Sequence, residues 1–438
     1  MFRLKQKLFI LIIYVGLLLC GFKAFAFDFE PGVGAGLEYT NNAALSANNQ
    51  QHDVIAIGYL GAKLEQSDGP VLADITATLN HHRYTQDTFK DQRYFNLGAF
   101  TSWEMVRNRF TWQLQDFYSQ RPINSTDPNT PDNIQDSNVF TFGANIVFPT
   151  SARQTFTLTP EYRNFYYEVQ LTDNQQYSLL ASWAYKKNSL TSIGFSATAR
   201  LVDYNEPLID DVVFGSVYFT LSNQRASSDI VTNLGSTYVE RENGQNTTEF
   251  AGNLNWLVNL TSHSRMRTYI GTDLTDSSEG QLNFLVDPEV GDPDAIQITT
   301  DVIRNQVVSI GYYRQDGTLA SSLSAELRKL NYSESPDDRR IWNVSGQLNY
   351  PLTALMRSGL YARYNDVDYL DSGRMDTDTI IGGNIGYQLS RNLKSSFDIR
   401  YRKRNSTVEL QNFDEWSAYI SLVYGFGQPL RPTRLGGF

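Results

Sequence analysis

The sequence has 438 residues, a formal net charge of −10 and a single cysteine. This acidic balance argues against nucleic acid, and against an anionic lipid surface, as the main partner. Aromatic residues are abundant, with 26 Tyr, 25 Phe and 6 Trp. Beyond the first segment, however, no stretch approaches the 18 consecutive apolar residues of a membrane-spanning helix.

Residues 1–26 are predicted to be a secretory signal peptide. Basic residues precede an apolar run over 8–19, which is too short for a permanent anchor. Ala24-Phe25-Ala26 supplies a small-residue site, and we expect cleavage after Ala26. A lipoprotein signal at Cys20 is disfavoured because Leu19 stands where a small residue is needed. Cleavage removes four basic residues and the only cysteine, so the remaining chain has a net charge of −14 and no disulfide.

After residue 30 the chain alternates apolar and polar residues with a period of two, which is typical of strands with two different faces. In residues 392–404, for example, Phe397 and Ile399 alternate with Asp398 and Arg400. The other clear cases are 140–148, 177–185, 250–260 and 416–426.

The composition of the two faces favours lipid over a soluble core as the environment of the apolar face. The apolar faces often begin and end with aromatic residues, as interfacial girdles do. The opposite face is rich in Gly, Ser, Asn and charged residues, as a wet lumen is. A soluble β-propeller or solenoid is the competing fold, but no blade-length motif repeats along the chain. The sequence therefore predicts a transmembrane β-barrel in the outer membrane.

Short connections alternate with mostly longer polar ones, as periplasmic turns alternate with outer loops in such barrels. Nine short ones lie at 67–70, 106–109, 149–153, 186–189, 223–228, 260–264, 315–317, 351–355 and 389–393. Counting strands between them predicts an all-β, antiparallel up-and-down barrel of about 20 strands, or 18 if weak strands merge. We expect the barrel to occupy 27–426 and a tail to occupy 427–438, where Pro429 and Pro432 argue against a strand. The longest connection, within 277–300, is expected to fold into the barrel and narrow it.

Charged residues on the polar face are the candidates for pore lining. The alternation points a mostly basic set of side chains inward: Arg163, Arg200, Arg265, Arg267, Glu326, Arg328, Arg357, Arg363, Lys394, Asp398, Arg400 and Arg402, together with Asp273. One interpretation is a basic lumen that favours anions, including acidic sugars. The other, equally weighted, is a network of ion pairs that stiffens the barrel.

The sequence offers no catalytic, cofactor or metal site. His81-His82 is the only notable histidine pair, and one of the two side chains is expected to face lipid and the other the lumen. A lipid-modifying enzyme would need such a His beside a Ser, which the sequence does not indicate. The acidic segment 287–295 lacks the ordered spacing of a calcium loop and is interpreted as a solvated loop.

A family resemblance rests on two segments. In 32–64, Tyr39-Thr40-Asn41-Asn42 is followed by a polar loop and Asp53, with Asn41 standing where Asp is more usual. Together with the similar segment 137–168, it resembles the outer-membrane β-barrel porin family whose members are often encoded in exopolysaccharide and PEP-CTERM loci. The resemblance implies an outer-membrane location and a link to polysaccharide secretion. It assigns no role to single residues.

The expected function is a porin-like channel, plausibly serving exopolysaccharide export, and not an enzyme. A non-conducting structural or surface-anchoring barrel, with a lumen filled by the 277–300 connection and by ion pairs, is the alternative. A lipid-modifying enzyme is a more distant one. The expected partners are outer-membrane lipid, the barrel-assembly machinery during biogenesis, and polysaccharide or export-system proteins. Nucleic acid is not among them.

Overall fold

The computed structural model describes residues 27–241, 246–280 and 296–431. The predicted signal peptide and the acidic segment 287–295 lie outside these described residues. Twenty strands follow one another along the chain: β1 Asp28–Thr40, β2 Asp53–Gln66, β3 Val71–Tyr84, β4 Gln92–Val106, β5 Phe110–Pro122, β6 Ile134–Pro149, β7 Gln154–Tyr167, β8 Asn174–Lys186, β9 Thr191–Tyr204, β10 Val212–Gln224, β11 Ser228–Arg241, β12 Thr247–Thr261, β13 Ser264–Asp276, β14 Val302–Asp316, β15 Leu319–Tyr332, β16 Arg339–Pro351, β17 Met356–Tyr369, β18 Arg374–Gln388, β19 Leu393–Ser406 and β20 Phe413–Gly425. Two short 3-10 helices, η1 Pro131–Asn133 and η4 Glu409–Gln411, lie in connections.

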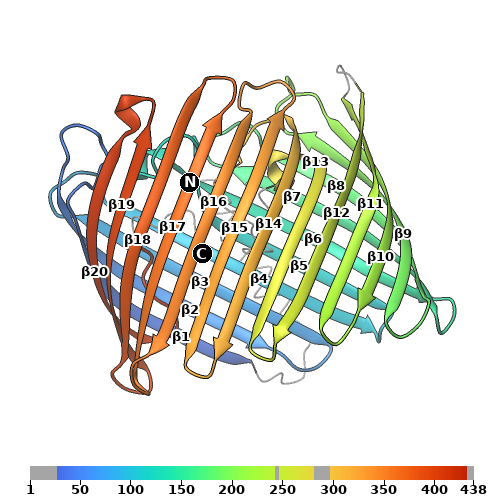
Figure 1. Cartoon of the computed structure of the whole chain (residues 1–438), viewed down its shortest axis with the longest axis horizontal. Helices are drawn as coiled ribbons and strands as arrows, with labels where there is room; N and C mark the ends of the chain where they lie inside the picture. Colours follow the sequence, from blue (N-terminus) through green and yellow to red (C-terminus); the bar gives the residue numbers. More distant parts are fainter. Residues whose placement is uncertain (1–26, 242–245, 281–295, 432–438) are drawn as a thin grey trace.

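Each strand pairs antiparallel with its neighbours in the sequence, and β1 pairs with β20 to close the sheet. Figure 1 shows the resulting barrel, with its strands running obliquely to the barrel axis. Closure pairs the edges that an open sheet would leave free, which is why a barrel can stand in a bilayer. The predicted up-and-down barrel of 20 strands is confirmed.

The connections differ between the two ends of the barrel. The tight turns, such as those after β2, β4 and β12, lie at the end where β1 begins and β20 ends. The longer connections, 41–52, 123–133 and 277–301 among them, lie at the other end. Because barrels of this type have short periplasmic turns and longer outer loops, we call these the periplasmic end and the outer end.

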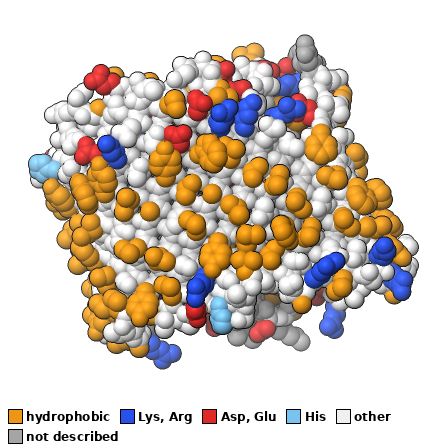
Figure 2. Space-filling view, viewed as in Figure 1, with side chains coloured by type: hydrophobic (Ala, Val, Ile, Leu, Met, Phe, Trp, Pro, Cys, Tyr) orange, Lys and Arg blue, Asp and Glu red, His pale blue; other side chains and the backbone are white. Residues whose placement is uncertain are grey.

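The outer face of the barrel is apolar. Large apolar side chains are exposed all round it, including Leu360, Phe250 and Ile381. Figure 2 shows them spread over the middle of one side, with charged side chains mainly near its upper and lower margins. Exposed aromatic residues stand at the periplasmic ends of strands: Trp103, Phe148, Tyr350, Tyr387 and Tyr424. An apolar band flanked by aromatic residues matches the hydrocarbon core and interface of a membrane.

Helices contribute little to the fold. Among residues 27–241, 246–280 and 296–431, none forms a helix long and apolar enough to cross a membrane.

Candidate functional site

Strand register places every predicted pore-lining residue on the inner face. In β19, Asp398 pairs with Tyr419 and Arg400 with Ser417, while the intervening Ile399 is exposed on the outer face. The same alternation turns inward the remaining members of the set: Arg163, Arg200, Arg265, Arg267, Glu326, Arg328, Arg357, Arg363, Lys394 and Arg402. Whether they line a conducting pore stays a prediction.

In the outer half of the barrel, inward arginines are held by carboxylates. Arg400 is bonded to the buried Glu415 at 3.2 Å, and Arg328 to Glu326 at 2.9 Å. Further pairs join Arg163 to Glu161 and Glu279, Arg200 to Asp276, and Arg402 to Asp378. Most of these carboxylates are absent from the sequence-based set, although the period-two rule, extended to the ends of each strand, would have found those on strands. Ion pairing is thus extensive in this half.

Clusters of buried apolar side chains also lie in the outer half, four of them among the residues that the structure describes. The inner face carries Val202, Phe214 and Val239 in one cluster, and Ile303 and Leu330 in a second. A third is built around Val139, Phe165 and Tyr167. The inner face, predicted to be rich in Gly, Ser, Asn and charged residues, thus also carries large apolar side chains near the outer end, where connections pack against it.

The long connection after β13 supplies part of this packing. Its residue Ile296 is buried in the second cluster and Ile298 in the third. Before the undescribed residues, 277–280 form one helical turn, and Ser277 donates a hydrogen bond to the carbonyl oxygen of Thr299. The described parts of this connection therefore lie inside the barrel wall, as expected for a segment that narrows it.

A second connection, residues 123–133 between β5 and β6, crosses the outer mouth. Ser125 accepts a hydrogen bond from Arg339 of β16 at 3.1 Å. The carbonyl oxygen of Thr126 accepts from Arg374 of β18 at 2.7 Å and from Arg404 of β19. These strands lie about half-way round the barrel from β5 and β6. This crossing could not be predicted from the sequence, because the contacts join residues more than 200 positions apart.

The tail after β20 turns back into the lumen. Gly425 and Gly427 have φ values of +85° and +83°, which glycine adopts without steric cost. At Gly427 a Cβ atom would come within 1.8 Å of the Tyr59 hydroxyl. The tail then bonds to β3: the Leu430 amide donates to Asn80 Oδ1, and His82 Nε2 donates to the Leu430 carbonyl oxygen, both at 2.8 Å.

Arg431 anchors this tail in a buried ion-pair site. Its guanidinium contacts the carboxylates of Glu38 from β1, at 3.0 Å, and of Asp398 from β19. It also lies 4.8 Å from the centre of the Tyr419 ring of β20. Burial alone would lower the pKa of Arg431, but Glu38 and Asp398 outweigh it and raise the pKa above its usual value. Asp398, which was predicted to line the pore, therefore forms an ion pair with the tail.

The periplasmic half of the inner face is different, because solvent reaches it. Arg265 of β13, Arg357 of β17 and Lys394 of β19 are exposed there, as are Gln347 and Asn349 of β16. Within the described part of the chain, Arg357 and Lys394 have no ion-pair partner within 4 Å. These residues form what we call the basic wall: Arg265, Arg357 and Lys394.

Acidic residues stand at the same end on other strands. Register turns Asp28 and Glu30 of β1 and Asp74 of β3 inward, and all three are exposed. Glu65 of β2 lies directly between Asp28 and Asp74, and it forms an ion pair with Lys63, the inward residue opposite Glu30. We call these four residues the acidic wall. The sequence-based set of inward charges began at residue 163 and therefore left out these acidic residues of the first strands.

The two histidines lie on opposite faces of the barrel wall, as expected. His82 is buried on the inner face and bonded to the tail, whereas His81 is half-buried, on the outer face, and 3.9 Å from Asp91. Their environment gives His82 a structural role in holding Leu430. Across the described ranges, no group of three or more His, Cys, Asp or Glu side chains could hold a metal ion.

Comparisons with known proteins return the barrel architecture. No protein-family model matches the sequence, and no curated protein matches it. Among solved structures, the siderophore receptor PirA from Pseudomonas aeruginosa is 12% identical, with 92% of this chain and 81% of that chain covered and a TM-score of 0.46. OccK2 (OpdF) from the same organism, in complex with glucuronate, is 9% identical, with 92% and 98% covered and a TM-score of 0.41. A loop-deletion mutant of OmpT, an outer membrane protein of Vibrio cholerae, is 7% identical, with 92% and 99% covered and a TM-score of 0.35.

These likenesses are too distant to carry an argument about solutes or mechanism. The class of the protein rests on its own structure: the sheet is closed, the outer face is apolar with aromatic residues at its margin, and short turns lie at one end of the barrel while longer connections lie at the other. The protein is a β-barrel of the outer membrane.

Proposed function

We propose that the protein is an outer-membrane channel for small charged or polar solutes, with a narrowed outer half and a charge-segregated periplasmic mouth. The observation that carries the proposal is the solvent-exposed inner surface at the periplasmic end, with its basic and acidic walls. Charges on the low-dielectric wall of a pore bias which ions enter. A barrel of 20 strands encloses enough space for an aqueous path unless its connections fill it.

The conductance of the purified, refolded protein in a planar bilayer tests this proposal. We expect small, steady currents with weak ion selectivity under a salt gradient, because the two walls carry opposite charge. A folded barrel that passes no current would contradict the proposal.

A pair of matched variants sharpens the test. Arg357→Glu with Lys394→Glu should move the reversal potential toward cation preference. Glu30→Lys with Asp74→Lys should move it toward anion preference. If neither pair moves the reversal potential, then ions do not pass along these walls.

A non-conducting structural barrel is the second candidate. The packing of apolar clusters and connections in the outer half favours it. It predicts no current from the folded protein and none after removal of residues 123–133, whereas the channel proposal predicts a larger current after that removal.

The resemblance to proteins of exopolysaccharide loci makes an acidic polysaccharide the proposed physiological cargo. An extended sugar chain would need the crossing connection 123–133 to move, since this segment spans the outer mouth. Addition of acidic oligosaccharides to the bilayer chamber should produce transient current blocks with the 123–133 deletion variant. Neutral oligosaccharides of equal length are the control.

A further inference from the structure

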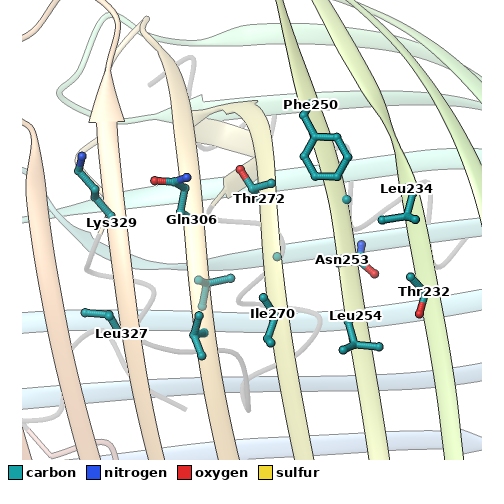
Figure 3. A pocket seen from close by; sticks show the side chains of 14 residues that line it. Thr232, Leu234, Phe250, Asn253, Leu254, Ile270, Thr272, Gln306, Leu327 and Lys329 are labelled. Carbon is teal, nitrogen blue, oxygen red and sulfur yellow. The ribbon is translucent and has the colours of Figure 1, made fainter.

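A shallow groove runs over the lipid-facing side of β11 to β15. Its volume is about 500 Å³. Figure 3 shows Leu234, Phe250, Leu254, Ile270 and Leu327 around it. Gly252 lies in its floor, where the lack of a side chain leaves the surface hollow. An apolar groove on a surface that faces lipid is suited to an acyl chain.

Polar residues border the groove on its outer-end side. Thr272, Gln306 and Lys329 are directly paired across β13, β14 and β15, so their side chains form one row on the outer face. Figure 3 shows the three at one level. The register continues from Lys329 to Arg340 on β16, so the row ends in two cations.

The pairing of Lys329 with Arg340 needs an explanation. Like charges directly opposite each other on neighbouring strands destabilise a sheet, and charge facing lipid adds a further cost that declines toward the interface. Neither side chain has an ion pair within 4 Å among the described residues. Asp368, beside Arg340 on β17, balances one of the two charges, which leaves an excess positive charge on the row.

The position of the row matches the outer leaflet. Lys329 is the fourth residue from the outer end of β15, and Arg340 is the second residue of β16. A headgroup at this depth would meet the two cations while its acyl chain extended along the groove toward the membrane centre. The acidic overall charge of the chain does not prevent this, because attraction falls off within about one Debye length, roughly 10 Å.

A neighbouring groove provides an internal contrast. It covers β7 to β11, has a volume of about 590 Å³, and is lined by residues such as Phe156, Trp183 and Phe219 without any charged side chain. A hollow between outward side chains is therefore not special by itself. The combination of a hollow with two adjacent cations distinguishes the β11–β15 groove.

We propose that this groove is a binding site for a phosphorylated lipid of the outer leaflet, of the lipid A type. The phosphate lies between Lys329 and Arg340, with Gln306 and Thr272 as additional hydrogen-bond donors. One acyl chain occupies the groove between Phe250 and Leu327. The proposal is independent of whether the barrel conducts.

Native mass spectrometry of the full folded protein in detergent micelles, titrated with diphosphoryl lipid A, tests the site. At about 1 kcal/mol for each cation near a charged membrane surface, Lys329→Gln with Arg340→Gln should weaken binding roughly thirtyfold. Lys403→Gln is the matched control, because Lys403 also faces outward near the outer end but pairs with Asp414. It should leave the affinity unchanged.

Two further ligands and one variant separate the parts of the proposal. Dephosphorylated lipid A should bind the wild type as weakly as lipid A binds the double variant, and inorganic phosphate alone should not bind measurably. Ile270→Trp, which adds bulk in the apolar part of the groove without changing charge or removing a proposed hydrogen-bond donor, should also weaken binding of lipid A. Heat-modifiable migration on gels establishes that each variant is folded.

Equal affinity of lipid A for the wild type and the double variant would overturn the site. If dephosphorylated lipid A bound the wild type as tightly as diphosphoryl lipid A does, the phosphate would have no role in binding. Tight binding of inorganic phosphate alone would show an anion site and overturn its assignment to lipid.

Discussion

The outer and periplasmic halves of the lumen are built from the same strands but have different interiors. In the outer half, Ile303 and Leu330 are fully buried and Arg400 is locked to Glu415. In the periplasmic half, Arg357 and Lys394 are exposed to solvent. The inner face of a single strand can therefore form part of a buried core at its outer end and a solvent-exposed surface at its periplasmic end.

Removal of the connection 123–133, which crosses the outer mouth, should have the largest effect on the difference between the two halves of the lumen. Replacement of residues 123–133 by a short Gly-Ser turn takes away the hydrogen bonds to Arg339, Arg374 and Arg404 and opens the outer mouth. We expect the single-channel conductance to rise severalfold. Replacement of 370–373, an exposed connection between β17 and β18, is the control. An unchanged conductance would show that the narrowest point lies elsewhere.

Arg431 offers the next largest effect. Arg431→Met leaves the buried Glu38 and Asp398 without their cation, and loss of one partner of a buried ion pair costs about 3–5 kcal/mol. We expect a lower unfolding midpoint in urea and a higher conductance, as the tail leaves the lumen. Arg391→Met, in the exposed turn before β19, should change neither. A more stable Arg431→Met barrel would contradict this account of the tail.

Variants of the ion pair between Arg400 and Glu415 test whether this pair stabilises the barrel or determines the ion selectivity of the pore. Arg400→Glu places two carboxylates together in a buried position, so we expect a marked loss of stability, with a smaller shift of the reversal potential than Arg357→Glu produces. The double variant Arg400→Glu with Glu415→Arg should recover part of the stability. A large selectivity shift with unchanged stability would mean that Arg400 faces the ion path.

The smallest expected effect is a pH dependence in the connection 168–173. Burial raises the pKa of Asp173 above its usual value, and the hydrogen bond from the Tyr167 amide opposes this rise. A carboxyl whose pKa is raised in the folded state stabilises that state at low pH, and the contribution is lost as pH rises through the folded-state pKa. The protection factors of the amide hydrogens in 168–173, which correct for the intrinsic exchange rate at each pH, should therefore be higher at pH 4 than at pH 7. Asp173→Asn should remove the difference.

The sequence predicted the barrel well because the period of two is a local signal. A strand such as β19 displays Phe397 and Ile399 on one face and Asp398 and Arg400 on the other, whatever its neighbours are. The alternation of short and long connections then fixes the strand number and the two ends. Extension of the same rule to Glu415 and Asp74 would have revealed the pairing partners and the acidic wall.

The contents of the lumen could not be predicted in this way. Ser125 meets Arg339, and Arg431 meets Glu38, across hundreds of residues of sequence. No periodicity encodes such contacts, because they depend on barrel diameter and on the path of irregular segments. The apolar residues that face inward near the outer end also look like ordinary strand residues until the connections that cover them are placed.

The position of Arg431 has a consequence for the order in which the barrel closes and the tail binds. Its carboxylate partners belong to β1 and β19, and its ring contact belongs to β20, so it bridges both sides of the seam at which the first and last strands meet. Arg431 follows β20, the last strand of the barrel, in the sequence. Arg431 can bind these partners only after β1 and β20 have paired, so we expect the tail to stabilise the barrel once it has closed. Chains truncated before Arg431 should close more slowly and open more readily.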